Sequence, residues 1–184
     1  MEITQKYKET IFLNELGAIK DEKIRNEVKR LVSLCPDYFF TIPASSTGKY
    51  HPDYALGEGG LVRHSKAAVF FAIQLLQLEM FEKLQSERDI IIGSLILHDC
   101  IKTDGTQYTK AEHPILACKF IEENCINVDI AFKLCDLIKP HMGQWNTDYQ
   151  GNAILPKPTS PAQKFVHLCD YLASRKNVEL KIIP

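Results

Sequence analysis

The chain has 184 residues, of which 45% are hydrophobic and 24% are charged. This length predicts a single domain that can bury a core without disulfides or a structural metal, and the composition excludes a disordered or collagen-like chain. The 22 Lys and Arg residues nearly balance the 23 Asp and Glu residues, which gives a net charge of −1. A protein that binds long nucleic acids should be more basic. The composition therefore favours a small or short substrate.

No stretch of the sequence has the pattern of a membrane segment or a secretion signal. The longest apolar run, residues 90–97, is much shorter than the roughly 18 residues that cross a bilayer, and residues 1–6 lack the apolar core of a signal peptide. We therefore expect a cytoplasmic protein with no membrane partner. The six cysteines form no CxxC pair, and we expect them to behave as small hydrophobic residues in a reducing compartment.

The N-terminal third predicts two amphipathic helices followed by a long loop. Hydrophobic spacing indicates one helix over residues 3–19 and a second helix that Asp21 caps and Pro36 ends. We expect residues 1–50 to be peripheral, with residues 51–184 forming the main domain of one globular unit. The alternative is that the apolar faces of the first two helices form the contact of a homodimer.

Residues 36–60 are rich in Pro and Gly and predict an irregular segment, with a short extended piece at residues 38–42. Long loops in compact domains are often functional. This loop is a candidate for a lid or for an element that shapes the substrate site, and the alternative is a mobile surface loop.

The rest of the chain predicts further helices and no large sheet, because strand-like alternation is absent. Two strongly apolar helices are expected at the centre: residues 61–83, and a helix that a capping box of Ser86 and Asp89 opens and that runs to Leu97. Further helices are expected from Pro114 to about residue 125, from Asp129 to about residue 140, and from Ser160 to about residue 172. The sequence thus predicts an all-α fold with about seven helices.

Four histidines and two acids stand at the ends or on the buried faces of these helices: His64, His98, Asp99, His113, His141 and Asp170. The doublet at 98–99 follows eight almost entirely apolar residues, and a buried carboxylate is costly unless it is paired or bound to a metal. Each residue taken alone also has a purely structural interpretation, such as an ion pair or a capped carbonyl. Taken together, imidazole and carboxylate groups form a suitable ligand set for Fe, Mn, Co, Ni or Zn.

The order of these six residues resembles that of the HD-domain superfamily of metal-dependent phosphohydrolases. Residues 97–102, Leu-His-Asp-Cys-Ile-Lys, resemble the hydrophobic-HD-x-x-K signature of that family. Residues 59–64, Gly-Gly-Leu-Val-Arg-His, resemble a segment of some HD proteins, including certain oligoribonucleases, and residues 169–174 resemble the closing Asp segment. The resemblance spans about residues 57–175 and implies an HD-domain helical bundle.

The resemblance also implies roles for the matching residues. His64, His98, Asp99 and Asp170 would hold a first divalent metal ion, and His113 and His141 would hold a second, with Asp99 as the bridge. With a single ion, the latter two histidines would instead contact substrate phosphate. Asp99 and Lys102 would be catalytic, the lysine by stabilising phosphoryl oxygens or by positioning a proton donor. The alternative for Lys102 is a solvated lysine at a helix end.

The implied reaction is hydrolysis of a phosphate ester by water that the metal activates. The substrate would be a nucleotide, a cyclic dinucleotide or a short oligonucleotide. Further substrate contacts are expected from Arg63, His51, Gln144 and Trp145, and the tryptophan could stack on a base or simply pack against the protein. His167, three residues before Asp170, is expected to orient that carboxylate or to make an unrelated hydrogen bond in the core.

Two other functions are compatible with the same ligands. A few HD-fold proteins are di-iron oxygenases, and the sequence indicates the ligand residues but does not identify the metal. A non-catalytic metal- or nucleotide-binding regulatory module is the other alternative. Lys102 and its context favour the hydrolase over the oxygenase, and the complete ligand set argues against a module that has lost catalysis.

Overall fold

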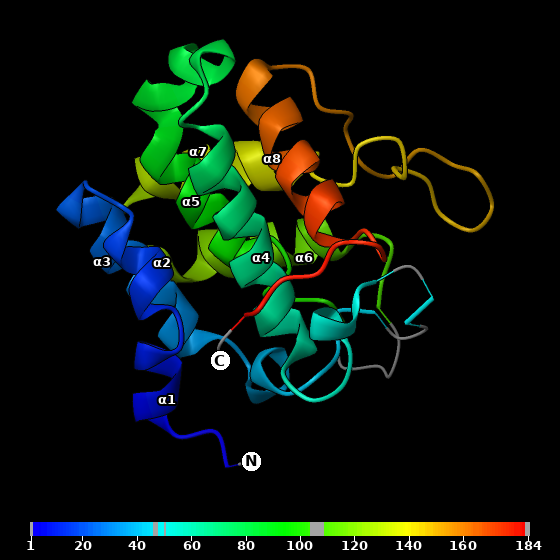
Figure 1. Ribbon diagram of the computed structural model, residues 1–184, viewed down its shortest axis with the longest axis horizontal. Coiled ribbons are helices and arrows are strands. Elements are labelled where there is room, and N and C mark those ends of the chain that lie inside the picture. Colours follow the sequence, from blue (N-terminus) through cyan, green and yellow to red (C-terminus); the bar gives the residue numbers. More distant parts are fainter. Residues whose placement is uncertain (1, 46–47, 50, 104–108, 183–184) are drawn as a thin grey trace.

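The computed structural model describes residues 2–45, 48–49, 51–103 and 109–182. Within these ranges the chain is all-α, which confirms the predicted fold class, and its β-structure is limited to one isolated bridge between Thr147 and Ala153. The α-helices are α1 (Gln5–Thr10), α2 (Leu13–Gly17), α3 (Glu22–Leu34), α4 (Gly60–Leu75), α5 (Arg88–Leu97), α6 (His113–Asn124), α7 (Val128–Ile138) and α8 (Pro161–Ala173) (Figure 1). Three 3₁₀ segments complete the described elements: η1 (Asp37–Phe40), η2 (Asp53–Ala55) and η3 (Glu79–Glu87).

Helices α4 and α5 form the centre of the bundle. Every residue of α5 from Ile90 to Leu97 is buried, as this almost entirely apolar run predicts. Helix α8 packs along α4, α7 packs on α5, and α6 packs on α7 (Figure 1). Each of the ligand candidates thus belongs to a helix that packs in this central group, or follows the end of one.

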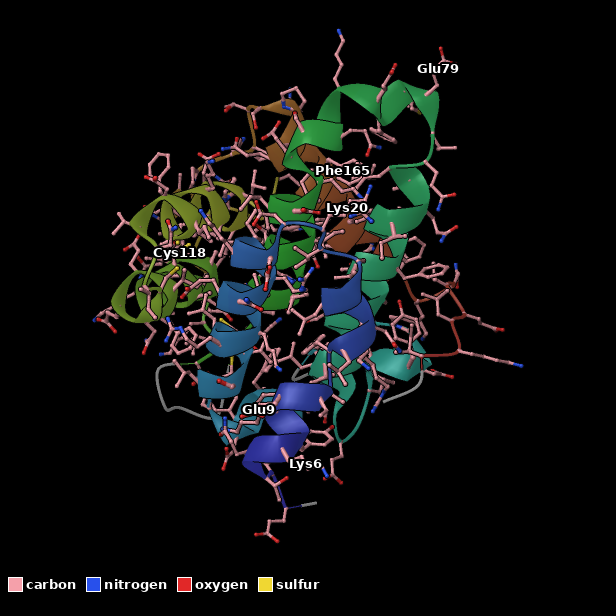
Figure 2. All side chains as sticks on the ribbon, turned by 90° about the vertical axis from the view of Figure 1, so that its left-hand side faces the viewer. Lys6, Glu9, Lys20, Glu79, Cys118 and Phe165 are labelled. Carbon is pink, nitrogen blue, oxygen red and sulfur yellow. The ribbon has the colours of Figure 1, made fainter. Side chains whose placement is uncertain are left out.

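The N-terminal helices cover one side of the central pair, with α3 packed on α5 (Figure 2). Asp21 caps α3 as predicted, accepting hydrogen bonds from the backbone N–H groups of Lys23 and Ile24. The expected single helix over residues 3–19 is wrong, because the chain turns at residues 11–12 between α1 and α2. This turn buries Phe12 completely, where its ring stacks on Phe39. Apolar side chains of the N-terminal segment join the same core as α4 and α5.

The segment between α3 and α4 is folded tightly against the start of α4. Its expected extended piece at residues 38–42 is wrong, since residues 37–40 form η1 and bury Phe39 and Phe40. Backbone hydrogen bonds connect the segment to itself and to α4, from Ala44 N–H to Ala55 O and from Leu61 N–H to Ile42 O. These bonds hold the segment beside the cavity described below.

Gly60 is required where this segment meets α4. A Cβ atom at this position would lie 2.3 Å from the Ala55 carbonyl oxygen and 3.1 Å from Pro43 Cα. Both neighbours are backbone atoms, so a substitution must move the chain. We therefore expect Gly60→Ala to lower the free energy of unfolding by about 2–3 kcal/mol, as overpacked core variants do.

Urea denaturation followed by circular dichroism measures this effect, with Gly17→Ala as the control. Gly17 ends α2, and a Cβ atom there would meet no heavy atom within 4 Å. The control should change the unfolding free energy by no more than about 0.5 kcal/mol. Equal stability of the two variants would contradict the close packing at Gly60.

The structure corrects one predicted helix end and two predicted helix starts. Helix α4 ends at Leu75 rather than at residue 83, and Ser86 does not form the expected capping box. The Asp89 carboxylate instead accepts hydrogen bonds from the backbone N–H groups of Lys20 and Asp21, at 3.0 and 2.7 Å. Asn127, rather than Asp129, caps α7. Ser160 and Gln163 do form a capping box, at the start of α8.

None of the helices in the described part of the chain is both long enough and apolar enough to cross a membrane. The longest of the α-helices, α4, has 16 residues.

Candidate metal centre

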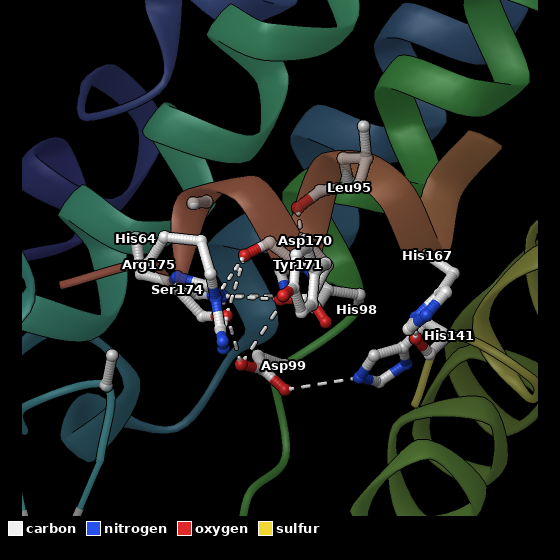
Figure 3. Close-up of polar contacts among 12 residues, drawn as sticks. His64, Leu95, His98, Asp99, His141, His167, Asp170, Tyr171, Ser174 and Arg175 are labelled. Carbon is white, nitrogen blue, oxygen red and sulfur yellow. Dashed lines mark hydrogen bonds and ion pairs between the residues drawn. The ribbon is translucent and has the colours of Figure 1, made fainter. Parts of the chain in front are cut away.

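The six predicted ligand residues come together from five places in the chain. His64 lies on α4 and Asp170 on α8, while His98 and Asp99 directly follow α5. His113 is the first residue of α6, and His141 follows α7. All four histidines and Asp99 are buried. Figure 3 shows the side chains of His64, Asp99 and Asp170 pointing toward one another, with His141 joined to the far side of Asp99.

The first group consists of His64, His98 and Asp170, whose ligand atoms lie close enough together to hold one metal ion. His64 Nε2 is 3.0 Å from Asp170 Oδ1 and 3.3 Å from His98 Nε2. His98 Nε2 is 3.5 Å from Asp170 Oδ1. Consider two ligand atoms that each lie about 2.1 Å from one metal ion. They are roughly 3.0–3.4 Å apart when the angle between them at the metal lies between a right angle and the tetrahedral angle. The spacing of the first group therefore fits a transition metal.

Asp99 lies between the first group and the remaining histidines. Its Oδ2 is 3.4 Å from His98 Nε2 and 3.8 Å from His64 Nε2, on the side of the first group. Its Oδ1 is 3.1 Å from His113 Nε2 and 3.7 Å from His141 Nε2. We call Asp99, His113 and His141 the second group. His98, Asp99 and His141 also satisfy the spacing for a metal ion, so the two groups are continuous.

Backbone carbonyls fix the tautomer of three of these histidines. The Nδ1 atoms of His98, His113 and His141 lie 2.8–2.9 Å from the carbonyl oxygens of Leu95, Lys110 and Ile138, each three residues earlier. A carbonyl oxygen only accepts hydrogen bonds, so each Nδ1 must carry the proton and donate it. In the neutral ring, Nε2 then presents a lone pair to the cluster. This is the arrangement found behind metal-ligating imidazoles.

The donor atoms need a cation between them. With the tautomers above, the lone pairs of His113 Nε2 and His141 Nε2 face each other at 3.2 Å and also face Asp99 Oδ1. This contact is repulsive unless a proton or a metal ion intervenes. Asp99 Oδ1 is a buried atom with no hydrogen-bond partner among the described residues. The donor set therefore fits a metal better than it fits a closed hydrogen-bond network.

The charges around the cluster keep both carboxyl groups ionised. Burial alone raises the pKa of Asp99, but Lys102 and His98 outweigh burial and lower that pKa well below its usual value. Burial likewise raises the pKa of Asp170, and its close contacts with His64 and His98 outweigh burial and lower the pKa. Burial, followed by the nearby His98, lowers the pKa of His141 to about 3. At neutral pH the second group thus combines a carboxylate with an unprotonated imidazole.

Lys102 lies beside the Asp99 carboxylate, three residues later in the chain. Its Nζ is 2.7 Å from Asp99 Oδ2 and donates a hydrogen bond to the Ala44 carbonyl oxygen at 3.2 Å. The side chain is buried, and it borders the same cavity as the metal ligands. The structure therefore gives Lys102 a place in the site rather than at a solvated helix end.

A cavity of about 670 Å³ opens onto the cluster. Its walls include five of the six predicted ligands, with His98 behind them, and also His51, Lys102 and Trp145. The His51 ring meets the His64 ring edge-on, with 5.5 Å between their centroids. The cavity is large enough for a small phosphorylated molecule.

Two predicted substrate contacts are not brought into the cavity. The Arg63 guanidinium faces the η2 segment and donates hydrogen bonds to the carbonyl oxygens of Tyr54 and Leu56, at 2.5 and 2.8 Å. Arg63 therefore anchors the loop before α4 instead of facing substrate. Gln144 is exposed and does not line the cavity. The sequence around Arg63 and around Gln144 does not show whether either side chain faces the cavity.

Sequence reasoning missed Tyr171 and Arg175 as cavity residues. Tyr171 lies in the last turn of α8, and Arg175 lies two residues after the helix ends. Their closeness in the sequence to Asp170 was visible, but the cavity beside them was not.

His167 contacts the second group instead of orienting Asp170. Its Nδ1 donates a hydrogen bond to the His141 carbonyl oxygen at 2.7 Å (Figure 3). Gly143 makes room for the ring, since a Cβ atom there would lie 2.2 Å from His167 Cε1. The φ of Gly143 is +62°, a conformation that favours glycine. Gly143 and His167 together hold the turn that carries His141.

We expect Gly143→Ala to weaken metal binding at the second group by about 10- to 100-fold, as changes behind metal ligands do. The added methyl group must displace the His167 ring from the His141 carbonyl. Titration with Zn²⁺ or Mn²⁺ followed by calorimetry measures the change. Gly151→Ala is the control, because Gly151 also has a positive φ, +86°, but no atom lies within 4 Å of the added carbon. Equal metal affinity in both variants would refute the role of the His167 contact.

Comparisons of the chain with protein-family models, with curated proteins and with solved structures gave no match. The fold and the site therefore define the class directly: an all-α protein with a buried cluster of His and Asp residues that could hold metal ions.

Proposed function

We propose that this protein is a metal-dependent phosphohydrolase of the HD type that acts on a small phosphorylated substrate. The observation that carries the proposal is the position of Asp99, with one oxygen toward His64 and His98 and the other toward His113 and His141. The order of the ligands along the chain, the HD-x-x-K segment and the adjoining cavity support the same class.

The chemistry of the donor set suits hydrolysis of a phosphate ester. A divalent transition metal held by these residues supplies a Lewis acid and lowers the pKa of bound water. Lys102 places an ammonium group at the cavity wall, where it offsets charge on phosphoryl oxygens. His51 also lines the cavity, with its ring edge-on to the ring of His64.

Metal content and phosphate release, measured on the same preparations, test this proposal. Gently purified protein is analysed by elemental mass spectrometry and is also reconstituted with Mn, Fe, Co, Ni or Zn. Each form is then assayed against phosphomonoesters, cyclic nucleotides, cyclic dinucleotides and short oligonucleotides. Asp170→Ala is the test variant, and Asp129→Ala, at an exposed position on α7, is the matched control.

The expected result is bound transition metal and release of phosphate or nucleotide. Asp170→Ala should lose the metal of the first group together with the hydrolysis, and Asp129→Ala should keep both. Bound iron with oxygen uptake and no hydrolysis would replace the proposal with the oxygenase alternative. Ligand binding without turnover, with every metal tested, would replace it with a regulatory module.

A further inference from the structure

Three side chains form a stacked wall beside the metal cluster. The rings of Trp145 and Tyr171 lie nearly parallel, with 12° between their planes and 5.8 Å between their centroids. The Arg175 guanidinium lies 4.0 Å from the centroid of the Tyr171 ring. All three residues line the cavity that holds the metal ligands. We call Trp145, Tyr171 and Arg175 the aromatic wall.

Trp145 is held in place yet remains open to a ligand. Its backbone N–H donates to the Met142 carbonyl oxygen, and the next residue, the buried Asn146, is tied to Leu155. One face of the indole is covered by Tyr171, but the side chain is still 47% exposed. A tryptophan that served only to fill the core would be buried. The exposed part of the indole is therefore a fixed apolar surface at the cavity.

Arg175 adds a positive charge to this wall. It donates hydrogen bonds to the Tyr171 carbonyl oxygen and to Ser174 Oγ, at 3.1 and 2.9 Å, and it pairs with no carboxylate in the described part of the chain. A guanidinium stays charged at any ordinary pH. Its position keeps the Tyr171 ring in place and leaves the wall suited to an electron-rich ring or an anion.

We propose that the aromatic wall binds the base of a nucleoside phosphate while the phosphate lies at the metal cluster. This inference rests on the proposed function and narrows its substrate class. A planar ring is required, so sugar phosphates and other phosphates without a planar ring bind poorly. Stacking on an aromatic side chain tolerates any base, so the wall selects for a base without selecting which one.

Trp145 is the only tryptophan in the chain, so its fluorescence reports on this wall alone. The metal-loaded protein is titrated with adenosine 5′-monophosphate and, separately, with ribose 5-phosphate, and emission is read directly after mixing. We expect the nucleotide to quench Trp145 and to bind about 5- to 100-fold more tightly than ribose 5-phosphate, the range that stacking of one base supplies. Equal affinity for the two probes, or no quenching by the nucleotide at saturation, would overturn the inference.

Calorimetry with two variants removes the dependence on fluorescence. Trp145→Ala should lose the preference for adenosine 5′-monophosphate over ribose 5-phosphate. Tyr149→Ala should keep it, because Tyr149 lies in the same loop, is 96% exposed and does not line the cavity. A preference that survives in Trp145→Ala would overturn the inference.

The two proposals fail in different ways. Quenching by the nucleotide without hydrolysis of any phosphate ester supports the aromatic wall and overturns the phosphohydrolase. Hydrolysis of ribose 5-phosphate as efficiently as of adenosine 5′-monophosphate supports the phosphohydrolase and overturns the aromatic wall.

Discussion

Asp99→Ala is expected to lose metal from both groups at once, with total metal content falling by at least about tenfold. This effect is expected because the two oxygens of Asp99 face opposite groups. His113→Ala should reduce only the metal of the second group, since His113 Nε2 contacts Asp99 Oδ1 and His141.

Elemental mass spectrometry of the wild type, Asp99→Ala and His113→Ala, each reconstituted with the same metal, measures this difference in metal content. Asp99→Ala also leaves the buried Lys102 without its carboxylate, which is costly for folding. Asp99→Asn is therefore made in parallel, because it keeps the shape of the side chain and removes its charge, and circular dichroism verifies the fold. Metal content in a folded Asp99→Asn variant equal to that of the wild type would refute the bridging role.

Lys102→Gln is expected to lower kcat for hydrolysis by about 100- to 1000-fold, the loss typical when one group that stabilises charge in the transition state is removed. Metal content should remain unchanged, because a lysine ammonium does not ligate a metal. Lys102 Nζ lies 2.7 Å from Asp99 Oδ2 and borders the cavity, so its charge is placed where phosphoryl oxygens would lie.

Phosphate release and metal content are measured together for Lys102→Gln and for Lys139→Gln. Lys139 pairs with Glu122 at the surface, so its replacement should leave both quantities near wild-type values. Loss of metal in Lys102→Gln would assign the lysine to holding Asp99 in place. An unchanged kcat with metal retained would remove Lys102 from the reaction.

The sequence by itself determined the fold class and the set of ligand candidates. Helical spacing of apolar residues marked α4, α5, α7 and α8, and the all-α prediction is confirmed. Burial of His98 and Asp99 followed from the apolar run before them, because the end of a core helix is itself in the core. The six ligand candidates form one cluster, as their chemistry predicted. The division of the chain at residue 50 stays a prediction.

Local sequence patterns predicted secondary structure less well where a tertiary contact competed with the local motif. Ser86 and Asp89 have the spacing of a capping box, yet Asp89 bonds to the turn between α2 and α3. Residues 3–19 have continuous helical spacing, yet the chain turns to bury Phe12. In both cases a partner distant in sequence supplies more burial or hydrogen bonding than the local motif.

Only the tertiary structure decided which side chains share the site. The carbonyls behind His98, His113 and His141 orient the three Nε2 atoms, and Asp99 turns one oxygen to each group. Arg63, one residue before a ligand, faces the loop, while Arg175, five residues after one, faces the cavity. The physical reason is that helical periodicity fixes the faces of each helix separately, whereas the packing of α4, α5, α7 and α8 fixes which faces and helix ends meet.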